Sequence, residues 1–411
     1  MPQLSFTHIE ALDATDPMRH TRARFALPDG VIYLDGNSLG ALPRSAAERV
    51  RATVETEWGE GLIRSWNSAD WIDLPRRLGD RLAGVVGAEP GSVIAADSTS
   101  INLFKVLSIG LALRPERRVI LSEEGNFPTD LYIAAGLADL LGRGHELRTV
   151  PAGEIAAHLG PDVAVLMLTE VNYRTGARHD MARLTAAAHG AGAVTVWDLA
   201  HSAGAFPVDL AGADADLAVG CGYKYLNGGP GAPAFAYVAP RLQAALSQPL
   251  TGWMGHARPF AFAPDYEPAA GIDTLRVGTP PIIAMSALDG ALDAFEGVEL
   301  GDLRRKADVL WDIFVAEIGA AAPELELLTP TEPGRRGTQA SFRHPEAYAI
   351  MQALIARGVI GDYREPDILR FGITPLYLRY ADMWNAARII AEVMDSGEWD
   401  RPDFRRKAKV V

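Results

Sequence analysis

Lysine is rare in this 411-residue chain, and Lys224 has the most unusual surroundings of any lysine in it. It follows the apolar run 217–219 and lies between Tyr223 and Tyr225, just before the glycine-rich segment 227–231. An amine that loses hydration among apolar and aromatic groups favours its neutral form, which is the nucleophile that a Schiff base requires. The pattern therefore indicates a Schiff-base lysine, although a lysine whose stem lies along a strand end would give the same pattern.

Asp198 directly follows the apolar run 194–197, and His201 comes three residues later. A carboxylate at the end of a buried strand is costly unless it is paired, and a protonated pyridine nitrogen is one suitable partner. Pyridoxal 5′-phosphate (PLP) needs an aspartate there to act as an electron sink. Asp198 is therefore a candidate for this role, with His201 supporting it or the cofactor phosphate. A turn-capping aspartate and a hydrogen-bonded core histidine are the alternatives.

Two further segments follow apolar runs and could bind the rest of such a cofactor. Thr99 and Ser100 stand between an apolar run and a helix-like segment, where hydroxyls and backbone amides can hold a phosphate. Phe127 and Asp130 follow the next apolar run and could supply a ring for stacking and a carboxylate. Ordinary helix caps would produce both patterns as well.

Short apolar runs alternate with amphipathic segments from about residue 80 to 240, which is typical of an α/β domain with a mostly parallel sheet. The predicted strands are 93–96, 118–121, 163–168, 193–197, 217–219 and 234–238. The predicted helices between the earlier strands are 101–113, 130–141 and 181–191. Because such sheets bind ligands at the carboxyl ends of their strands, the candidate residues fall where a site is expected.

The pattern changes after residue 281 to longer helices, which predicts a second, smaller unit of α+β type. Its predicted helices are 282–295, 300–318, 346–356 and 382–394, and its predicted strands are 339–342 and 369–373. We expect an N-terminal arm over 1–62, with one helix at 43–58, that packs with the small domain. A large α/β domain over 63–285 and a small domain over 286–411 complete the expected organisation.

The composition narrows the class of protein. A net charge of −13 without a basic stripe argues against nucleic acid and anionic membranes as partners. The single cysteine, Cys221, fits a reducing compartment, so we expect a cytoplasmic protein. No apolar run is long enough for a membrane span. Without a second cysteine or a zinc-type histidine pair, we expect no metal site.

Taken together, these residues resemble the fold-type I PLP enzymes of the aminotransferase-like superfamily. More closely, the chain is similar to the kynureninase family over nearly its full length. Four segments carry the resemblance: Tyr33–Gly40 (YLDGNSLG), Phe127–Asp130 (FPTD), Asp198–His201 (DLAH) and Tyr223–Gly231 (YKYLNGGPG). The resemblance implies hydrolysis of L-kynurenine to anthranilate and L-alanine by a homodimer whose active sites lie at the subunit interface.

The resemblance also implies roles for individual residues. PLP would be contacted by Thr99, Ser100, Phe127, Asp130, Thr169, Asp198, His201, Tyr223, Lys224, Trp253 and, from the neighbouring subunit, Thr279. The substrate would be bound by Asn37, Ser38, Trp66 and Arg370, with Arg370 holding the α-carboxylate in a bidentate pair. Lys224, Asp198 and Tyr223 would be the catalytic groups, Lys224 as the base and Tyr223 as a proton donor or only a phosphate ligand.

Several alternatives stay open at this point. A class V aminotransferase would use the same cofactor, and a catalytically inactive PLP-fold scaffold would keep the fold alone. A cysteine desulfurase would need a mobile cysteine, whereas Cys221 lies in or beside a predicted strand. Animal kynureninases tend to have Asn where Thr279 stands, which leaves the choice between kynurenine and 3-hydroxykynurenine open. A role in tryptophan breakdown or in NAD synthesis is also open.

Overall fold

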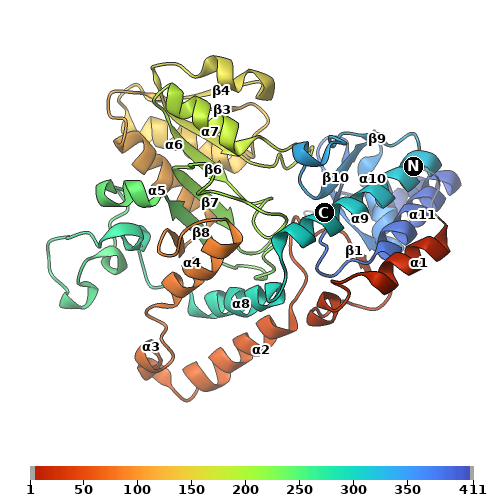
Figure 1. The fold of residues 1–411 in the computed structure, drawn as a ribbon, viewed down its shortest axis with the longest axis horizontal. Helices are drawn as coiled ribbons and strands as arrows, with labels where there is room; N and C mark the ends of the chain where they lie inside the picture. Colours follow the sequence, from red (N-terminus) through yellow and green to blue (C-terminus); the bar gives the residue numbers. More distant parts are fainter. Residues whose placement is uncertain (1–4, 408–411) are drawn as a thin grey trace.

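The computed structural model describes residues 5–407 and places seven strands in one large sheet, in the order β2-β8-β7-β6-β5-β3-β4 (Figure 1). The strands are β2 (Val93–Ala95), β3 (Val119–Glu123), β4 (Glu146–Val150), β5 (Val163–Thr169), β6 (Val194–Asp198), β7 (Leu217–Cys221) and β8 (Ala234–Val238). Only β8 runs against its neighbours β2 and β7. The mostly parallel α/β sheet expected from the sequence is therefore confirmed.

Both faces of this sheet are covered, and its central strands are buried on both sides. Neighbouring residues of β5 face opposite ways: Leu166 and Leu168 belong to one apolar cluster, Val165 and Met167 to the other. On the first face pack α4 (Leu74–Val85), α7 (Met181–Gly190) and α8 (Ile282–Leu292). On the second face pack α5 (Thr99–Ala112) and α6 (Pro128–Leu141). The short α3 (Ser65–Ser68) precedes α4.

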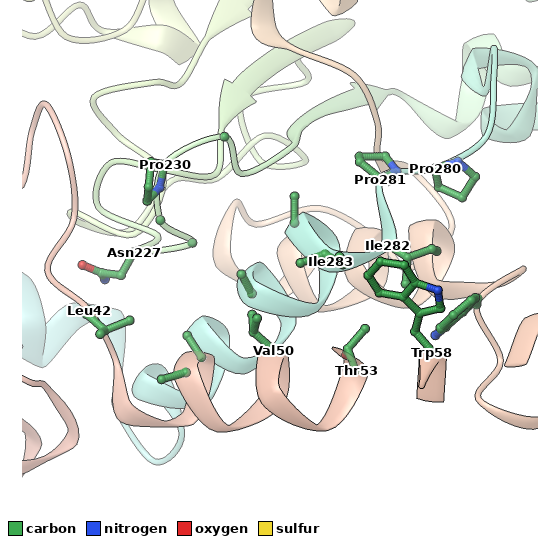
Figure 2. Close-up of a pocket in the computed structure, with 18 of the residues that line it drawn as sticks. Leu42, Val50, Thr53, Trp58, Asn227, Pro230, Pro280, Pro281, Ile282 and Ile283 are labelled. Atoms are coloured by element: carbon green, nitrogen blue, oxygen red, sulfur yellow. The ribbon is translucent and has the colours of Figure 1, made fainter. Parts of the chain in front are cut away.

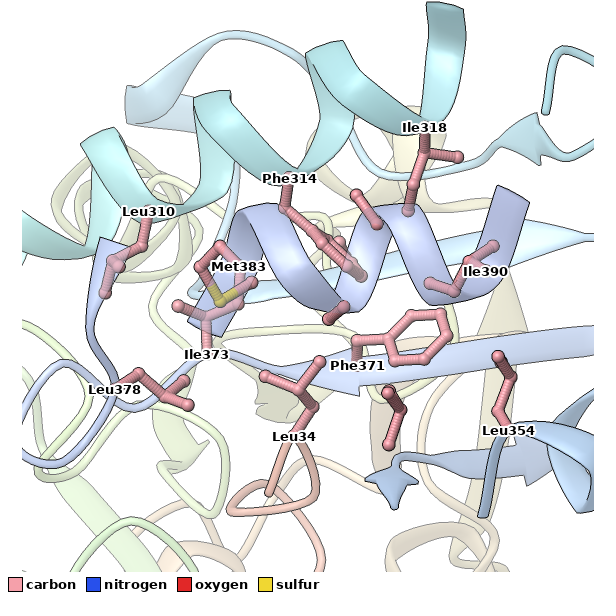
Figure 3. Close-up of a cluster of buried hydrophobic side chains, with 14 of the residues drawn as sticks. Leu34, Leu310, Phe314, Ile318, Leu354, Phe371, Ile373, Leu378, Met383 and Ile390 are labelled. Carbon is pink, nitrogen blue, oxygen red and sulfur yellow. The ribbon is translucent and has the colours of Figure 1, made fainter. Parts of the chain in front are cut away.

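A smaller antiparallel sheet organises the C-terminal unit, in the order β12-β13-β10-β9. Its strands are β9 (Glu326–Leu327), β10 (Gln339–Arg343), β12 (Asp362–Arg364) and β13 (Ile368–Gly372), and its helices are α9 (Leu300–Ala321), α10 (Ala347–Ala356) and α11 (Tyr380–Ser396). Figure 3 shows its core, where Phe314 of α9 packs edge-on against Phe371 of β13 with ring centres 5.2 Å apart. This core holds β12 and β13 rigidly beneath the helices.

The N-terminal segment contacts both units. Helix α1 (Phe6–Thr15) packs against α11 of the small unit, and β1 (Ile32–Tyr33) pairs in parallel with β11 (Val359–Ile360). Helix α2 (Arg44–Ala52) instead packs against α8 at the large sheet (Figure 1). The expected boundary at residue 285 falls inside α8, so we propose that the division between the units lies after Phe295.

The helix expected over 43–58 is not a single α-helix. Helix α2 ends at Ala52, and residues Thr53–Trp58 continue as a π-helix. At the change of register the Thr53 hydroxyl donates to the Arg49 carbonyl, 3.0 Å away, and accepts from the Arg49 guanidinium. This hydroxyl bonds back to the carbonyl four residues earlier at the point where the α-register ends.

Candidate active site

Lys224 lies just beyond the end of β7, at the carboxyl edge of the large sheet. Its Nζ is 3.1 Å from Nε2 of His201, 5.7 Å from the ring centre of Phe127 and 5.9 Å from that of Tyr223. His201 follows β6, and Phe127 immediately precedes α6. Three segments distant in sequence therefore meet around the one amine that the sequence had singled out.

Asp198 is the last residue of β6 and is paired in register with Thr169 of β5. Its Oδ1 accepts a hydrogen bond from the backbone amide of Ala200 at 2.7 Å. Burial raises the pKa of Asp198, and the Lys224 charge opposes this rise. Burial and then the Asp198 charge raise the pKa of Asp130 well above its usual value. Burial thus favours the protonated form of both carboxyls, and the charge of Lys224 opposes this at each of them.

Asn126 belongs to this group and was missed by the sequence analysis. The Thr169 hydroxyl donates to Asn126 Oδ1 and lies 3.3 Å from Asp130 Oδ2. Asn126 Nδ2 in turn donates to Ser122 Oγ at 3.0 Å. Its position beside the FPTD segment was the only available signal, because an asparagine before a helix is usually a cap.

Two buried polar atoms beside Lys224 have no hydrogen-bond partner: Nδ1 of His201 and Oδ1 of Asp130. A bound polar group could supply the hydrogen bonds that these two atoms lack. Burial and then the charges of Lys224, Arg370 and Arg364 hold the pKa of His201 well below its usual value, so this imidazole is neutral. A flat, polar cofactor that stacks on Phe127 and pairs with Asp198 fits these surroundings.

The candidate phosphate residues Thr99 and Ser100 are half-buried in the first turn of α5, where the Ser98 hydroxyl accepts from the amide of Ile101. Lys105, which has no exposed surface, lies one turn further along and was also missed. Its Nζ donates to Asp97 and, at 2.6 Å, to the carbonyl of Leu275. This buried ion pair ties the loop before α5 to the segment leading to Thr279.

Arg370 of β13 is buried, and its guanidinium already holds protein partners. Nε donates to Asp362 Oδ1 at 2.8 Å, and Nη1 donates to the carbonyl of Tyr173 at 2.7 Å. Nη2 donates to Ser38 Oγ at 2.8 Å and to the second Asp362 oxygen. The bidentate edge expected to bind a substrate is therefore occupied by Asp362, a residue that the sequence analysis did not select.

The remaining candidates are Asn37, Trp66, Thr279 and Trp253. Asn37 is fully buried, and neither atom of its side-chain amide has a partner. Trp66 and Thr279 line an apolar cavity of about 1020 Å³ next to the 227–231 loop, shown in Figure 2. Trp253 is 40% exposed and stacks on Phe262, with ring centres 6.1 Å apart. Among the described residues, the Trp253 ring packs against the rings of Phe260 and Phe262, and not against that of Phe127.

Among residues 5–407, no three His, Cys, Asp or Glu side chains are grouped so that they could hold a metal ion. Within the same range, no helix is both long and apolar enough to cross a membrane.

Comparisons with known proteins agree on one family. Residues 303–390 match the family model described as the kynureninase C-terminal domain. The chain is 54% identical over 408 residues to a kynureninase of Pseudomonas fluorescens, and 55% identical over 409 residues to kynureninases of Burkholderia pseudomallei (strain 1106a) and Burkholderia mallei (strain ATCC 23344). Each comparison covers 98% of both chains.

Solved structures share the fold at much lower identity. A C-DES variant with glycine covalently linked to its PLP cofactor has a TM-score of 0.78 at 19% identity, and covers 90% of this chain and 99% of its own. A cysteine desulfurase of Thermococcus onnurineus NA1 has a TM-score of 0.77 at 17% identity, with 92% and 98% covered. These likenesses establish the fold-type I architecture alone. The identity to curated relatives over nearly the entire length shows more: the chain belongs to the kynureninase family.

Proposed function

We propose that this chain uses PLP to hydrolyse L-kynurenine, adding one water molecule and releasing anthranilate and L-alanine. The observation that carries the proposal is the arrangement at the sheet edge: Lys224 is enclosed by His201 and Phe127, and Asp198 ends the neighbouring strand. Family membership supplies the substrate class, since the relatives are named kynureninases.

The cofactor is PLP, and the described residues suit each part of it. Lys224 would provide the covalent attachment, Asp198 would pair with the ring nitrogen and Phe127 would stack on the ring. Thr169, Asp130 and His201 would lie near the ring. The phosphate would be held by Thr99, Ser100 and Tyr223, together with Trp253 and the Thr279 of a second subunit. When bound, PLP supplies an electron sink for the carbon that loses its proton.

The protein groups then move and hold protons around the substrate. When its amine is free, Lys224 would accept the α-proton of the bound substrate. Neutral His201, 3.1 Å away, can accept a hydrogen bond from the resulting ammonium group. Burial raises the pKa of Tyr223, so its hydroxyl keeps a proton that it can donate to the β-carbon of the departing alanine.

A homodimer with shared active sites is the second part of the proposal. Large apolar side chains line the cavity of Figure 2 although they are exposed in the single chain: Leu42 is 49%, Trp58 55% and Ile283 43% exposed. A monomer rarely leaves so many large apolar groups together in water, whereas a dimer would bury them. Thr279 and Trp66 lie in the same cavity, as residues that reach a partner's site would.

Three narrower assignments complete the proposal. We favour kynurenine over 3-hydroxykynurenine as the substrate, because position 279 is Thr in this chain. We also propose a role in tryptophan breakdown or NAD synthesis. A reducing cytoplasm suits the one cysteine, Cys221, which is buried and unpaired.

The purified holoenzyme tests this function directly. With kynurenine alone, we expect anthranilate and alanine to form in equal amounts. A class V aminotransferase would instead consume a keto acid, and an inactive scaffold would form neither product. Absence of anthranilate from a preparation fully loaded with PLP would overturn the proposal.

A further inference from the structure

Arg370 has few donors left for a substrate. A guanidinium carries five N–H groups. In Arg370, one binds Asp362 Oδ1, two on Nη2 bind Asp362 and Ser38, and one on Nη1 binds the Tyr173 carbonyl. A single N–H on Nη1 remains, and the side chain is only 2% exposed. Arg370 alone therefore cannot hold a carboxylate through two bonds in this arrangement.

A second guanidinium stands beside it on β12. Arg364 Nη2 lies 2.7 Å from Asp362 Oδ2 and donates to Ser38 Oγ at 2.9 Å, while Nη1 donates to the carbonyl of Tyr363. Its Nε and one Nη1 hydrogen are not used by these bonds. The Arg364 side chain is 30% exposed. A ligand can therefore reach Arg364 more readily than it can reach Arg370.

Both guanidinium groups lie close to the Lys224 centre. The carbonyl that Arg370 binds belongs to Tyr173, whose ring packs edge-on against Phe127 at 5.1 Å. The charges of Arg370 and Arg364 also both act to lower the pKa of His201, which contacts Lys224. A molecule attached at Lys224 therefore has these two cations within reach.

The charge balance of this cluster leaves room for one anion. Burial alone would raise the pKa of Asp362, but Arg370, together with Arg364 and Ser38, more than offsets this and holds the pKa below its usual value, so Asp362 is ionised. Burial and the Asp362 charge raise the pKa of Asp35 to about 8, so at neutral pH Asp35 is mostly protonated. Two guanidinium groups against one carboxylate give a net charge of one positive unit in a largely buried site.

We propose that Arg364 is a further substrate-binding residue: the substrate α-carboxylate is shared between Arg364 and the one free N–H of Arg370. Asp362 is then a positioning residue, which holds both guanidinium groups in place without touching the substrate. This inference rests on the proposed function, because it requires an amino acid bound at Lys224. It differs from the expected bidentate pair with Arg370 alone, because the more accessible arginine also binds the carboxylate.

The test compares Arg364→Gln with the wild-type holoenzyme toward two ligands. One is kynurenine, and the other is the amine that kynurenine would give on loss of its carboxylate. Binding is followed through the visible absorbance of the cofactor, and turnover through anthranilate. We expect R364Q to weaken kynurenine binding and raise KM at least about 10-fold, with binding of the amine changed less than about 2-fold. PLP content stays unchanged.

Controls separate this inference from the function and from folding. Arg343→Gln removes an exposed arginine of the same sheet that pairs with Glu326, and leaves both ligands unaffected. Arg364→Lys keeps the charge without the fork, and recovers part of the lost affinity. If R364Q does not fold, R364K carries the same comparison. Equal weakening toward both ligands, or an unchanged KM, would overturn the inference, whereas a wild type that forms no anthranilate would overturn the function itself.

Discussion

Asp198 is buried at a strand end where an unpaired charge would be costly, so its charge must serve a partner. We expect Asp198→Asn to fold and to lower kcat at least about 100-fold, because an amide of the same size cannot keep the cofactor ring nitrogen protonated. Steady-state kinetics and a thermal melt of the same preparation measure both effects. Asp139→Asn, on the exposed face of α6, is the matched control and retains full activity. If D198N kept the kcat of the wild type, Asp198 would be only a capping residue.

Asp35 gives a pH-dependent prediction. Burial and then the Asp362 charge raise its pKa from 3.8 to about 8 in the folded chain, so the folded state holds this proton more tightly than the unfolded state. Between about pH 4 and 8 the unfolded state binds fewer protons, and the free energy of unfolding falls as pH rises. Asp35→Asn has no carboxyl at this position and so lacks this pH-dependent loss. We therefore expect its free energy of unfolding, relative to that of the wild type, to rise by at least about 1 kcal/mol between pH 5 and pH 8.

Urea unfolding at the two pH values measures the difference. The asparagine amide can still donate toward Asp362, as the protonated carboxyl does, so the comparison isolates the charge. A stability difference between Asp35→Asn and the wild type that stays constant with pH would contradict the shifted pKa of Asp35.

At this scale the sequence was informative where a polar residue ends an apolar run. Lys224 and Asp198 could be selected in that way, and the structure brings Lys224 together with Phe127 and His201. Asp362 and Arg364 could not, because they stand in the short polar strand Asp362–Arg364, and their partner Ser38 is more than 300 residues away in sequence. Only the pairing of β12 with β13 and the approach of the N-terminal segment make them a cluster.

Helix α4 shows how closely an element must approach the sheet that positions the site. A Cβ at Gly79 would lie 2.0 Å from the carbonyl oxygen of Val93 in β2, whereas a Cβ at Gly84 of the same helix meets nothing within 4 Å. We therefore expect Gly79→Ala to destabilise the fold by about 1–3 kcal/mol through overpacking. Gly84→Ala should stabilise it by up to about 1 kcal/mol through helix propensity.

Denaturant unfolding of the two variants provides the measurement, and each serves as the control for the other. Equal stabilities for Gly79→Ala and Gly84→Ala would contradict the close contact between α4 and β2.

Among the elements, buried strands were predictable, including β2 at one edge of the large sheet, and partly exposed edge strands were not. Every residue of β5, β6 and β7 is buried, so their sequences are mostly apolar. Strand β4 was missed because it lies at the sheet edge, where Glu146 and Arg148 face water and break the apolar pattern. The π-helical end of the α2 segment was missed because the apolar periodicity that predicts a helix does not separate an α-helix from a π-helix.

For the whole molecule, the apolar face of Figure 2 leads to a prediction about assembly. We expect the wild type to sediment as a dimer at micromolar concentration. Ile283→Asp should shift it toward the monomer and lower activity in parallel, because a charge would be buried in the interface. Leu140→Asp alters a more exposed residue of α6, outside this cavity, and should remain dimeric. A monomeric wild type, or a dimeric and fully active I283D, would contradict the shared-site arrangement.

The two-unit organisation was visible in the sequence as a change of pattern, whereas the path of the N-terminal segment was not. Helix α1 and strand β1 join the small unit, and α2 joins the large one. No local pattern records such long-range pairing, because amphipathic helices bury the same kind of face against either unit. The arm brings Ser38 to Arg370, so the site depends on the whole chain being folded.

The claim on which everything else depends is that Lys224 carries the cofactor. Reduction of the purified holoenzyme with borohydride, followed by peptide mapping by mass spectrometry, tests this most directly, since reduction makes the link between PLP and its lysine permanent. We expect the added mass on Lys224 and no labelling of Lys105 or Lys306, which are buried in ion pairs with Asp97 and Asp16. A label on another lysine, or a holoenzyme that takes up no label, would contradict the assignment.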